Sequence, residues 1–332
     1  MYKLELERVA AEIRRKCVTR VLLQLPDGMR PFAFQMAGYL KKATTAEIIL
    51  SGDSCYGACD IASRQAKELG ADLLIHYGHT CFAQQGDIPT LYVEARVPID
   101  VDKLVEALVP HLSGRRVGLT STIQHTDQLI SVAERLKSRG FEALIGQGGG
   151  TTPECGQVLG CSYAAATTLP GGVDTYVFIG GGMFHPIGLA LTTGKPVVIV
   201  NPYDESVSRL EEAELMQLAK RRMAAIAAAS KAKTVGVLVS AKPGQRALSE
   251  AMIIAEKLGD RGVTTFLIYL DEVRADQLNN FTEPEAFVDT ACPRIAVNGV
   301  AGLDRPILTV AETRVLLRER SWEETWGPAY FS

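Results

Sequence analysis

Short runs of apolar and β-branched residues alternate with segments of helical periodicity from the beginning of the chain. Continuous apolar strands that alternate with helices are typical of parallel sheets covered on both faces. The pattern therefore predicts an α/β fold. In the first part of the chain it predicts strands at Val21–Leu25, Glu47–Leu50, Ala71–His76 and Pro89–Ala95, and helices at Pro31–Lys42 and Asp60–Leu69.

The same plan restarts twice. The second pass has strands at Arg116–Thr120, Phe141–Ile145, Asp174–Ile179 and Lys195–Val200, with a helix near Thr126–Ser138. A long helix, about Val207–Ser230, leads to a third pass with strands at Thr234–Val239, Val263–Tyr269, Ala286–Asp289 and Pro306–Thr309, and a helix near Gln245–Leu258. Internal repetition outranks any single element in a fold assignment. We expect three similar small parallel-sheet α/β domains at 1–105, 106–210 and 211–332, with boundaries near 98–113 and 205–232.

Composition and charge exclude several classes of protein. The chain has 332 residues, of which 47% are hydrophobic and 22% charged, so it is not a disordered or collagen-like chain. Its 35 Lys+Arg against 38 Asp+Glu show no basic excess, which argues against direct nucleic-acid binding. The sequence shows neither a membrane-spanning apolar run nor the apolar core of a signal peptide. We expect a cytoplasmic protein with no membrane contact.

The cysteines are the strongest chemical signal. In a cytoplasmic protein they are expected to be thiols, ligands or nucleophiles rather than disulfides. Cys59 follows a predicted strand and opens a helix, Cys161 lies in a Gly-rich segment, and Cys292 directly follows a strand. Ligand sites in open α/β sheets collect beyond the carboxyl ends of the strands, so three inward-facing domains would bring three thiolates to one centre. The seven cysteines are Cys17, Cys55, Cys59, Cys81, Cys155, Cys161 and Cys292.

Spacing alone leaves plainer interpretations open. Cys55 and Cys59 fit either ligands or buried thiols in a tight turn, and Cys155 and Cys161 fit a surface loop. The paired C-x₂₋₄-C motifs of structural zinc sites are absent, as is the C-x₂-C-x₂-C run of ferredoxins. Three thiolates on a four-iron cluster would leave one iron open to a substrate.

Polar and glycine residues at predicted strand ends are further binding candidates. Gln24 and Asp27 fit an ordinary turn as well as they fit a binding role. A turn also explains Gly180, Gly181 and Gly182, which lack the G-x-G-x-x-G pattern of a nucleotide loop. For His79, a hydrogen-bonded side chain at a strand end is favoured over a ligand. Arg294 lies within reach of an anion or a carboxylate. These candidates are Gln24, Asp27, His79, Gly180, Gly181, Gly182 and Arg294.

Four motifs in this order carry a resemblance to a known family. Together they resemble the archaeal 2-(3-amino-3-carboxypropyl)histidine synthases, which catalyse the first step of diphthamide biosynthesis. The resemblance covers nearly the whole chain, without a departure at these positions. The motifs are Gln24-Leu-Pro-Asp-Gly28, Gly52-Asp-Ser-Cys-Tyr-Gly-Ala-Cys-Asp60, Gly156-Gln-Val-Leu-Gly-Cys-Ser162 and Ala291-Cys-Pro-Arg-Ile295.

The resemblance implies a specific chemistry. In this family, three α/β domains in a pseudo-threefold arrangement surround a central [4Fe–4S] cluster, whose ligands here would be Cys59, Cys161 and Cys292. The open iron receives S-adenosylmethionine, which is cleaved to a 3-amino-3-carboxypropyl radical and methylthioadenosine. The radical adds to C2 of a histidine imidazole in translation elongation factor 2. Position 62 is Ala, so the C-x₃-C-x₂-C motif of the usual radical enzymes is incomplete. The other four cysteines would be bystanders.

The resemblance also implies partners. They are elongation factor 2 as protein substrate, an electron donor and a second copy in a homodimer, for which the apolar stretch Met223–Ala229 is a candidate contact. The seven strand-end candidates would hold the methionyl carboxylate or the nucleoside of S-adenosylmethionine. Two alternatives remain: a quinolinate synthase-like [4Fe–4S] dehydratase, which needs no reductant, and a zinc- or nucleotide-binding regulatory module. Metal analysis of anaerobically purified protein separates the regulatory module from the two enzymes.

Overall fold

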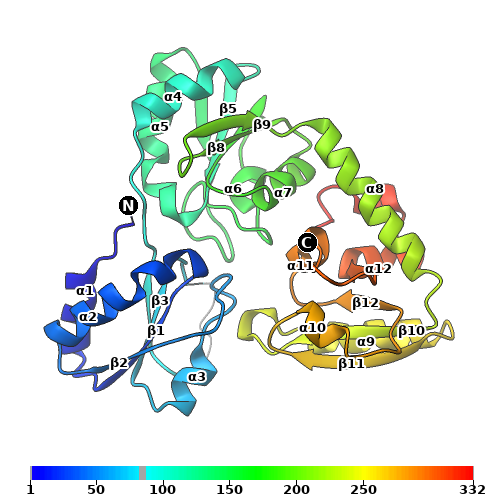
Figure 1. Cartoon of the computed structure of the whole chain (residues 1–332). Helices are drawn as coiled ribbons and strands as arrows, with labels where there is room; N and C mark the ends of the chain where they lie inside the picture. Colours follow the sequence, from blue (N-terminus) through cyan, green and yellow to red (C-terminus); the bar gives the residue numbers. More distant parts are fainter. Residues whose placement is uncertain (1, 82–86, 332) are drawn as a thin grey trace.

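Three sheets follow one another along the chain in the computed structural model, which describes residues 2–81 and 87–331 (Figure 1). Their strand orders are β2-β1-β3-β4, β6-β5-β7-β8-β9 and β11-β10-β12-β13. Among the described residues, the strand pairs are parallel apart from the antiparallel pair β8–β9. The predicted threefold repetition of a parallel α/β plan is confirmed. Each sheet with its helices is called the first, second or third unit below.

The first unit shows why these residues fold as they do. Val21 and Leu23 of β1 pack with Val9 and Ile13 under α1 and α2, whereas Leu22 faces α3 on the other side of the sheet. Both faces of the parallel sheet are thereby covered, as an apolar central strand requires. The unit contains α1 (Leu6–Arg15), β1 (Arg20–Gln24), the 3-10 helix η1 (Asp27–Phe32), α2 (Ala33–Ala43), β2 (Glu47–Leu50), α3 (Ser63–Glu68), β3 (Leu73–Tyr77) and β4 (Thr90–Val93).

The second unit repeats this plan and adds an antiparallel edge strand. Val117 and Leu119 of β5 and Val177 of β7 lie in the core on the side of α4 and α5, while Phe178 packs with α7 on the other side. The unit contains α4 (Val101–Leu108), η2 (Val109–His111), β5 (Arg116–Ser121), η3 (Ile123–Gln128), α5 (Leu129–Ser138), β6 (Glu142–Ile145), α6 (Ala164–Thr167), β7 (Thr175–Ile179), α7 (Phe184–Thr193), β8 (Val197–Asn201) and β9 (Ser206–Arg209).

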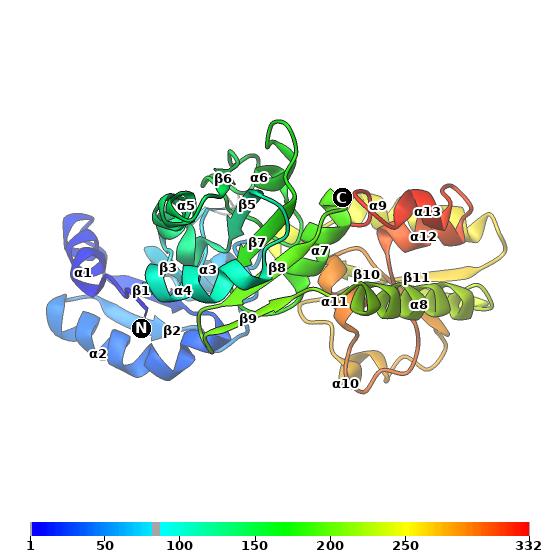
Figure 2. The same ribbon diagram turned by 90° about the horizontal axis from the view of Figure 1, so that it is seen from above.

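The long helix α8 leads from the second sheet to the third unit, and α1 and the third unit lie at opposite ends of the molecule (Figures 1 and 2). Arg222 of α8 is buried and forms an ion pair with Glu312 at 2.7 Å, which ties the helix to this unit. The unit contains α8 (Glu212–Ala229), β10 (Thr234–Ser240), η4 (Pro243–Gln245), α9 (Leu248–Gly259), β11 (Thr264–Leu270), α10 (Ala275–Leu278), β12 (Ala286–Asp289), α11 (Pro293–Asn298), β13 (Ile307–Thr309), α12 (Val310–Leu316) and α13 (Trp322–Thr325).

The start of α8 differs from the prediction. The helix expected from about Val207 begins at Glu212, because Ser206–Arg209 forms β9 against β8. Glu211 and Glu214 form a capping box there, which satisfies backbone N–H groups of the first turn. The sheets span residues 20–93, 116–209 and 234–309, and the predicted domain limits lie between them but stay a prediction. Within the described part of the chain, no helix is both long enough and apolar enough to cross a bilayer.

Candidate functional site

The three units meet at a cavity of about 330 Å³ that all three line. Cys59 of the first unit, Cys161 of the second and Cys292 of the third are part of its wall. Loops at the carboxyl ends of the parallel strands point toward this centre (Figure 1), where ligand sites of α/β sheets normally lie. The expected meeting of three cysteines from three sheets is therefore present in the structure.

Each cysteine lies in the connection between a strand and the helix that follows it. Cys59 lies between β2 and α3, and Cys161 lies between β6 and α6, so both follow the second strand of their unit. Cys292 caps α11 directly after β12, the third strand of its unit. The three loops are thus not strictly equivalent, although all belong to the same end of their sheets.

The first and third units touch directly at Cys59. Gln245 of η4 donates a hydrogen bond from Nε2 to Cys59 Sγ at 3.3 Å, and the backbone N–H of Gly244 donates to the Cys59 carbonyl at 2.9 Å. Lys242 adds ion pairs of 2.6 Å to Asp60 of the first unit and to Glu272 of the third. These contacts fix the cysteine loop of one unit against the strand end of another.

The electrostatics of the thiols reflect their closeness. Burial, with a smaller contribution from the nearby Cys59, raises the pKa of Cys161 to about 11 and that of Cys292 to about 12. Burial also raises the pKa of Cys59, opposed by the Gln245 hydrogen bond. Three thiolates gathered here require a positive charge between them, and a bound metal supplies such a charge. Sulfur donors suit soft sites such as iron–sulfur clusters, so this set fits the cluster that the resemblance implies.

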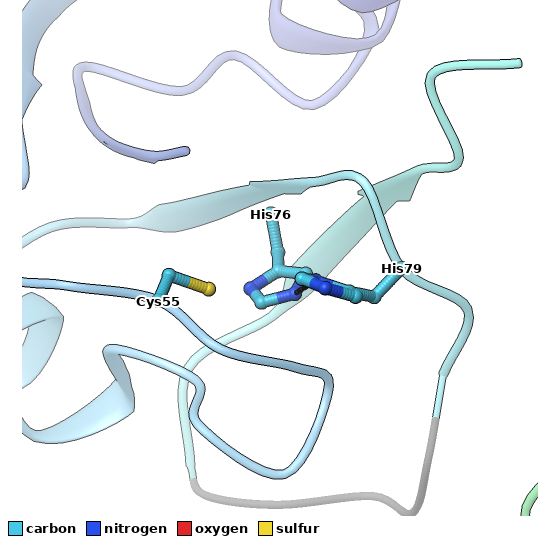
Figure 3. A group of neighbouring side chains, drawn as sticks. All are labelled: Cys55, His76 and His79. Carbon is cyan, nitrogen blue, oxygen red and sulfur yellow. Dashed lines mark hydrogen bonds between the residues drawn. The ribbon is translucent and has the colours of Figure 1, made fainter. Parts of the chain in front are cut away.

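A second group of possible ligands lies beside the cavity, in the first unit. One ligand atom from each of Cys55, His76 and His79 lies within 4.8 Å of the others (Figure 3). His76 Nε2 and His79 Nδ1 are 3.0 Å apart and hydrogen-bonded, and His76 Nδ1 lies 2.8 Å from Gln24 Oε1. Both ring nitrogens of His76 and Nδ1 of His79 are therefore already engaged in hydrogen bonds.

Backbone partners of Gln24 settle the direction of this chain of hydrogen bonds. Gln24 Nε2 donates to the Asp60 carbonyl at 2.8 Å, and Gln24 Oε1 accepts from the Ala62 N–H at 2.9 Å. Because Oε1 is an acceptor, His76 donates to it from Nδ1 and accepts at Nε2 from His79 Nδ1–H. Cys55 stands outside this chain, with Sγ 3.9 Å from the Asp60 carbonyl oxygen.

Both histidines are held neutral by their surroundings. Burial lowers the pKa of His76 well below its usual value and lowers that of His79 to about 4. His79 lines the cavity, whereas His76 is fully buried behind it. The arrangement matches the plainer of the two interpretations of these histidines, a hydrogen-bonded pair at a strand end, and it presents a neutral imidazole to the cavity.

Arg294 contributes a cation that is available for binding. Its guanidinium lies 5.6 Å from the centre of the Phe184 ring, and among the described residues no carboxylate lies within 4.0 Å of it. Arg294 lines the central cavity and also a neighbouring cavity of about 360 Å³, which shares Tyr56 and Cys292 with it. The two cavities therefore meet at this arginine.

The remaining predicted residues lie elsewhere. Asp27 is paired with Arg30 at 3.1 Å, and Gln24 is buried with its amide satisfied by the protein. Gly181 lies against the Tyr203 ring, and the loop formed by Gly180, Gly181 and Gly182 is not part of the cavity wall. Sequence reasoning missed Lys242 and Gln245, although both follow β10 at the carboxyl end of a central strand, a position that favours ligands.

The fold and the site define a class of protein with three repeated parallel α/β sheets and one cavity-lining cysteine from each. A sequence profile described as "Putative diphthamide synthesis protein" matches residues 25–327. The chain belongs to this diphthamide synthesis family, and the resemblance inferred from the four motifs is confirmed.

Relatives of known name and structure agree with this assignment. The chain is 38% identical to the 2-(3-amino-3-carboxypropyl)histidine synthase of Pyrococcus horikoshii, over 98% of this chain and 95% of that protein. It is 28% identical to human 2-(3-amino-3-carboxypropyl)histidine synthase subunit 1, over 100% of this chain and 75% of that protein. The crystal structure of Dph2 from Pyrococcus horikoshii with a 4Fe-4S cluster matches with a TM-score of 0.88 and 36% identity, covering 97% and 93% of the two chains.

Proposed function

We propose that this protein transfers the 3-amino-3-carboxypropyl group of S-adenosylmethionine to C2 of a histidine imidazole in translation elongation factor 2. This is the first step of diphthamide biosynthesis. The observation that carries the proposal is that Cys59, Cys161 and Cys292, each from a different sheet, line one cavity. The family and the full-length identity to the Pyrococcus horikoshii synthase favour this activity over the dehydratase and the regulatory module.

Cys59, Cys161 and Cys292 would hold a [4Fe–4S] cluster, as the Pyrococcus horikoshii relative contains one. The bound cluster supplies the electron and a Lewis-acidic iron for cleavage of the sulfonium. Gln245 and Lys242 keep the Cys59 loop in place through the contacts to Cys59 and Asp60. The chain would thereby provide three sulfur ligands, and one iron of the cluster would remain for S-adenosylmethionine.

Arg294 and the neighbouring cavity would bind S-adenosylmethionine. A guanidinium forms two parallel hydrogen bonds to a carboxylate, and Arg294 has no competing carboxylate among the described residues. The cavity of about 360 Å³ beside it has the size of a small-molecule site and meets the central cavity at Cys292. The methionyl carboxylate would thus be anchored next to the cysteines, with the nucleoside in the neighbouring cavity.

The acceptor imidazole would enter the central cavity. Its wall includes the aromatic rings of Tyr2, Phe184 and Tyr203, which offer flat apolar surfaces for packing and exclude water. Neutral His79, held by His76 and Gln24, faces the same space and is oriented to hydrogen-bond an incoming polar group. Elongation factor 2 is the proposed protein substrate, and a separate electron donor is required.

The test is anaerobic incubation of the reconstituted protein with dithionite and S-adenosylmethionine, followed by assay for methylthioadenosine. We expect methylthioadenosine, and transfer of the 3-amino-3-carboxypropyl group when elongation factor 2 is added. Release of 5′-deoxyadenosine instead would assign ordinary radical chemistry. Turnover without a reductant would contradict the proposal.

Arg294→Ala tests the carboxylate anchor. Loss of a charge-assisted pair should weaken S-adenosylmethionine binding about 10- to 100-fold while iron and sulfide content stay unchanged. Isothermal titration with the reconstituted protein measures the affinity, and Arg246→Ala, in a nearby arginine outside both cavities, is the control. Unchanged affinity in Arg294→Ala would remove this residue from the binding site.

A further inference from the structure

His79 lies between two residues that are hydrogen-bonded to the second unit. The Gly78 carbonyl accepts from Gln124 Nε2 at 2.6 Å. Thr80 Oγ1 accepts from Gln157 Nε2 at 3.0 Å. Gly78 has a φ of +85°, and a Cβ at this position would lie 2.6 Å from a proline side chain, so glycine is required. The backbone on both sides of His79 is therefore fixed before a substrate arrives.

The ring of His79 is fixed as well, by the chain of hydrogen bonds from Gln24 (Figure 3). His76 donates from Nδ1 to Gln24 Oε1 at 2.8 Å and therefore accepts at Nε2 from His79 Nδ1–H at 3.0 Å. Burial lowers the pKa of His79 to about 4, opposed by the Tyr77 carbonyl, so the ring is neutral near pH 7. A neutral imidazole carries one N–H, which leaves an unprotonated lone pair on His79 Nε2.

The Nε2 lone pair of His79 is open to the central cavity. His79 lines this cavity, and no hydrogen bond of the described residues ends at its Nε2 atom. The atom is also not among the enclosed side-chain atoms that lack a partner within residues 2–81 and 87–331. The cavity therefore contains a hydrogen-bond acceptor whose position is fixed and which is available to an incoming molecule.

The lone pair selects the kind of group that can bind to His79. A bare nitrogen pairs with a hydrogen-bond donor and not with an anion. It does not suit the methionyl carboxylate of S-adenosylmethionine, for which Arg294 is the proposed anchor. His79 is also absent from the wall of the neighbouring cavity of about 360 Å³, the proposed place of the nucleoside. The donor that remains for His79 is the N–H of the acceptor imidazole, which enters the central cavity.

We propose that His79 Nε2 accepts a hydrogen bond from the Nε2–H group of the histidine that is modified in elongation factor 2. This contact presupposes the proposed function. In a histidine side chain, Nε2 and C2 lie farthest from the backbone, so both atoms enter a cavity first. A hydrogen bond at Nε2 fixes the adjacent C2, the atom that receives the 3-amino-3-carboxypropyl group. It also selects the acceptor tautomer that carries its proton on Nε2.

His185, the second histidine in the described cavity wall, suits this contact less well. Its ring stacks on Phe178 with the ring centres 5.5 Å apart. Burial, with a smaller contribution from the nearby charge of Arg294, lowers the pKa of His185 to about 4. This ring therefore lies on the side of the proposed carboxylate anchor. No hydrogen bond within the described residues sets the tautomer of His185, whereas the acceptor atom of His79 is defined.

Two substitutions separate the proposed contact from the support that His79 gives to His76. His79→Gln places an amide oxygen near the position of Nε2 but loses the donor at Nδ1. His79→Asn keeps a donor near the position of Nδ1 but has no acceptor at the position of Nε2. A purely structural role of His79 predicts that the asparagine variant works better, and the proposed contact predicts the opposite order.

The measured quantity is the coupling ratio, which is the amount of group transferred to elongation factor 2 per methylthioadenosine released in the same anaerobic reaction. We expect a ratio within about 3-fold of wild type in His79→Gln and at least about 10-fold lower in His79→Asn, because a radical that meets a misplaced C2 is lost but still leaves methylthioadenosine behind. Equal ratios in the two variants, or a higher ratio in His79→Asn, would overturn the proposal. Circular dichroism and iron content identify a variant that has not folded.

The tautomer of His79 is tested without cluster, S-adenosylmethionine or elongation factor 2. In the full chain labelled with nitrogen-15 in its histidine rings, the chemical shifts show which ring nitrogen carries the proton. We expect a protonated Nδ1 and a bare Nε2 for His79 near pH 7, in the signal that is missing from whichever His79 variant folds. A protonated Nε2 overturns the proposal. A wild type that releases no methylthioadenosine contradicts the proposed function instead and leaves this result valid.

Discussion

Cys55 and Cys59 lie four residues apart in one turn, yet their surroundings are opposite. Cys55 is 4% exposed and lies beside the hydrogen-bonded pair of His76 and His79, while Cys59 lies in a cavity wall with two other thiols. Both groups bring possible metal ligands close together. The difference is that three of the four ring nitrogens in the histidine pair are already hydrogen-bonded within the first unit, whereas Cys59, Cys161 and Cys292 come from three units and line one cavity. Closeness of ligand atoms is therefore insufficient to define a metal centre.

Serine exchange gives the largest expected difference between the two groups. Cys59→Ser, Cys161→Ser and Cys292→Ser should each lower cluster content at least about 10-fold, because each removes a thiolate ligand. Cys55→Ser should retain the cluster. Iron and sulfide analysis after anaerobic reconstitution, with visible absorbance, measures this. The reverse pattern, with cluster lost in Cys55→Ser and kept in Cys59→Ser, would move the centre to the histidine group.

Removal of the Gln24 side chain should disrupt the chain of hydrogen bonds that joins Gln24, His76 and His79. Gln24→Ala leaves the buried His76 Nδ1–H, the Ala62 N–H and the Asp60 carbonyl without their partner, at a cost of about 2–4 kcal/mol in the free energy of unfolding. The control Asp27→Ala, in the same motif but in an exposed pair with Arg30, should change it by less than about 1 kcal/mol. Urea unfolding measures both variants. Equal effects would show that the hydrogen-bonded chain does not stabilise this region.

Lowering the pH should reduce the stability of the protein through protonation of His79 in the unfolded chain, without any substitution. Since the pKa of His79 is lowered to about 4, the unfolded chain binds a proton between about pH 6.5 and pH 4 that the folded chain does not. The contribution of neutral His79 to the free energy of unfolding is therefore complete above this range. It decreases as the pH is lowered, by at most about 2 kcal/mol between pH 7 and pH 5. His79→Gln should flatten the dependence in urea unfolding at pH 7, 6 and 5. An unchanged slope would show that His79 titrates normally.

Much of the fold could be predicted because it depends on local patterns. Apolar runs located the twelve strands that pair in parallel within residues 2–81 and 87–331, and their repetition indicated three sheets. β9 escaped prediction because Ser206–Arg209 is short and mostly polar, and it forms only by pairing with β8. The start of α8 was therefore placed too early.

The candidate site could be predicted only in part. The positions of the cysteines after strands indicated a common centre, since ligand sites of parallel α/β sheets collect at the carboxyl ends of the strands. The hydrogen bonds of His76 near Cys55 depend on the Gln24 amide, which belongs to another strand. The contact of Lys242 with Asp60 likewise joins distant parts of the sequence. Contacts of this kind have no periodicity that a sequence can reveal.

The placement of Cys292 in the last of the three sheets has a consequence for how the protein matures. Cys59 is synthesised early, but the third sulfur is available only after β12 has joined the last sheet, since β12 and α11 hold Cys292 in place. A nascent chain lacking this part would offer incoming iron an incomplete set of the ligands proposed above. Loading of the metal centre would then have to wait until translation and folding of the third unit are complete.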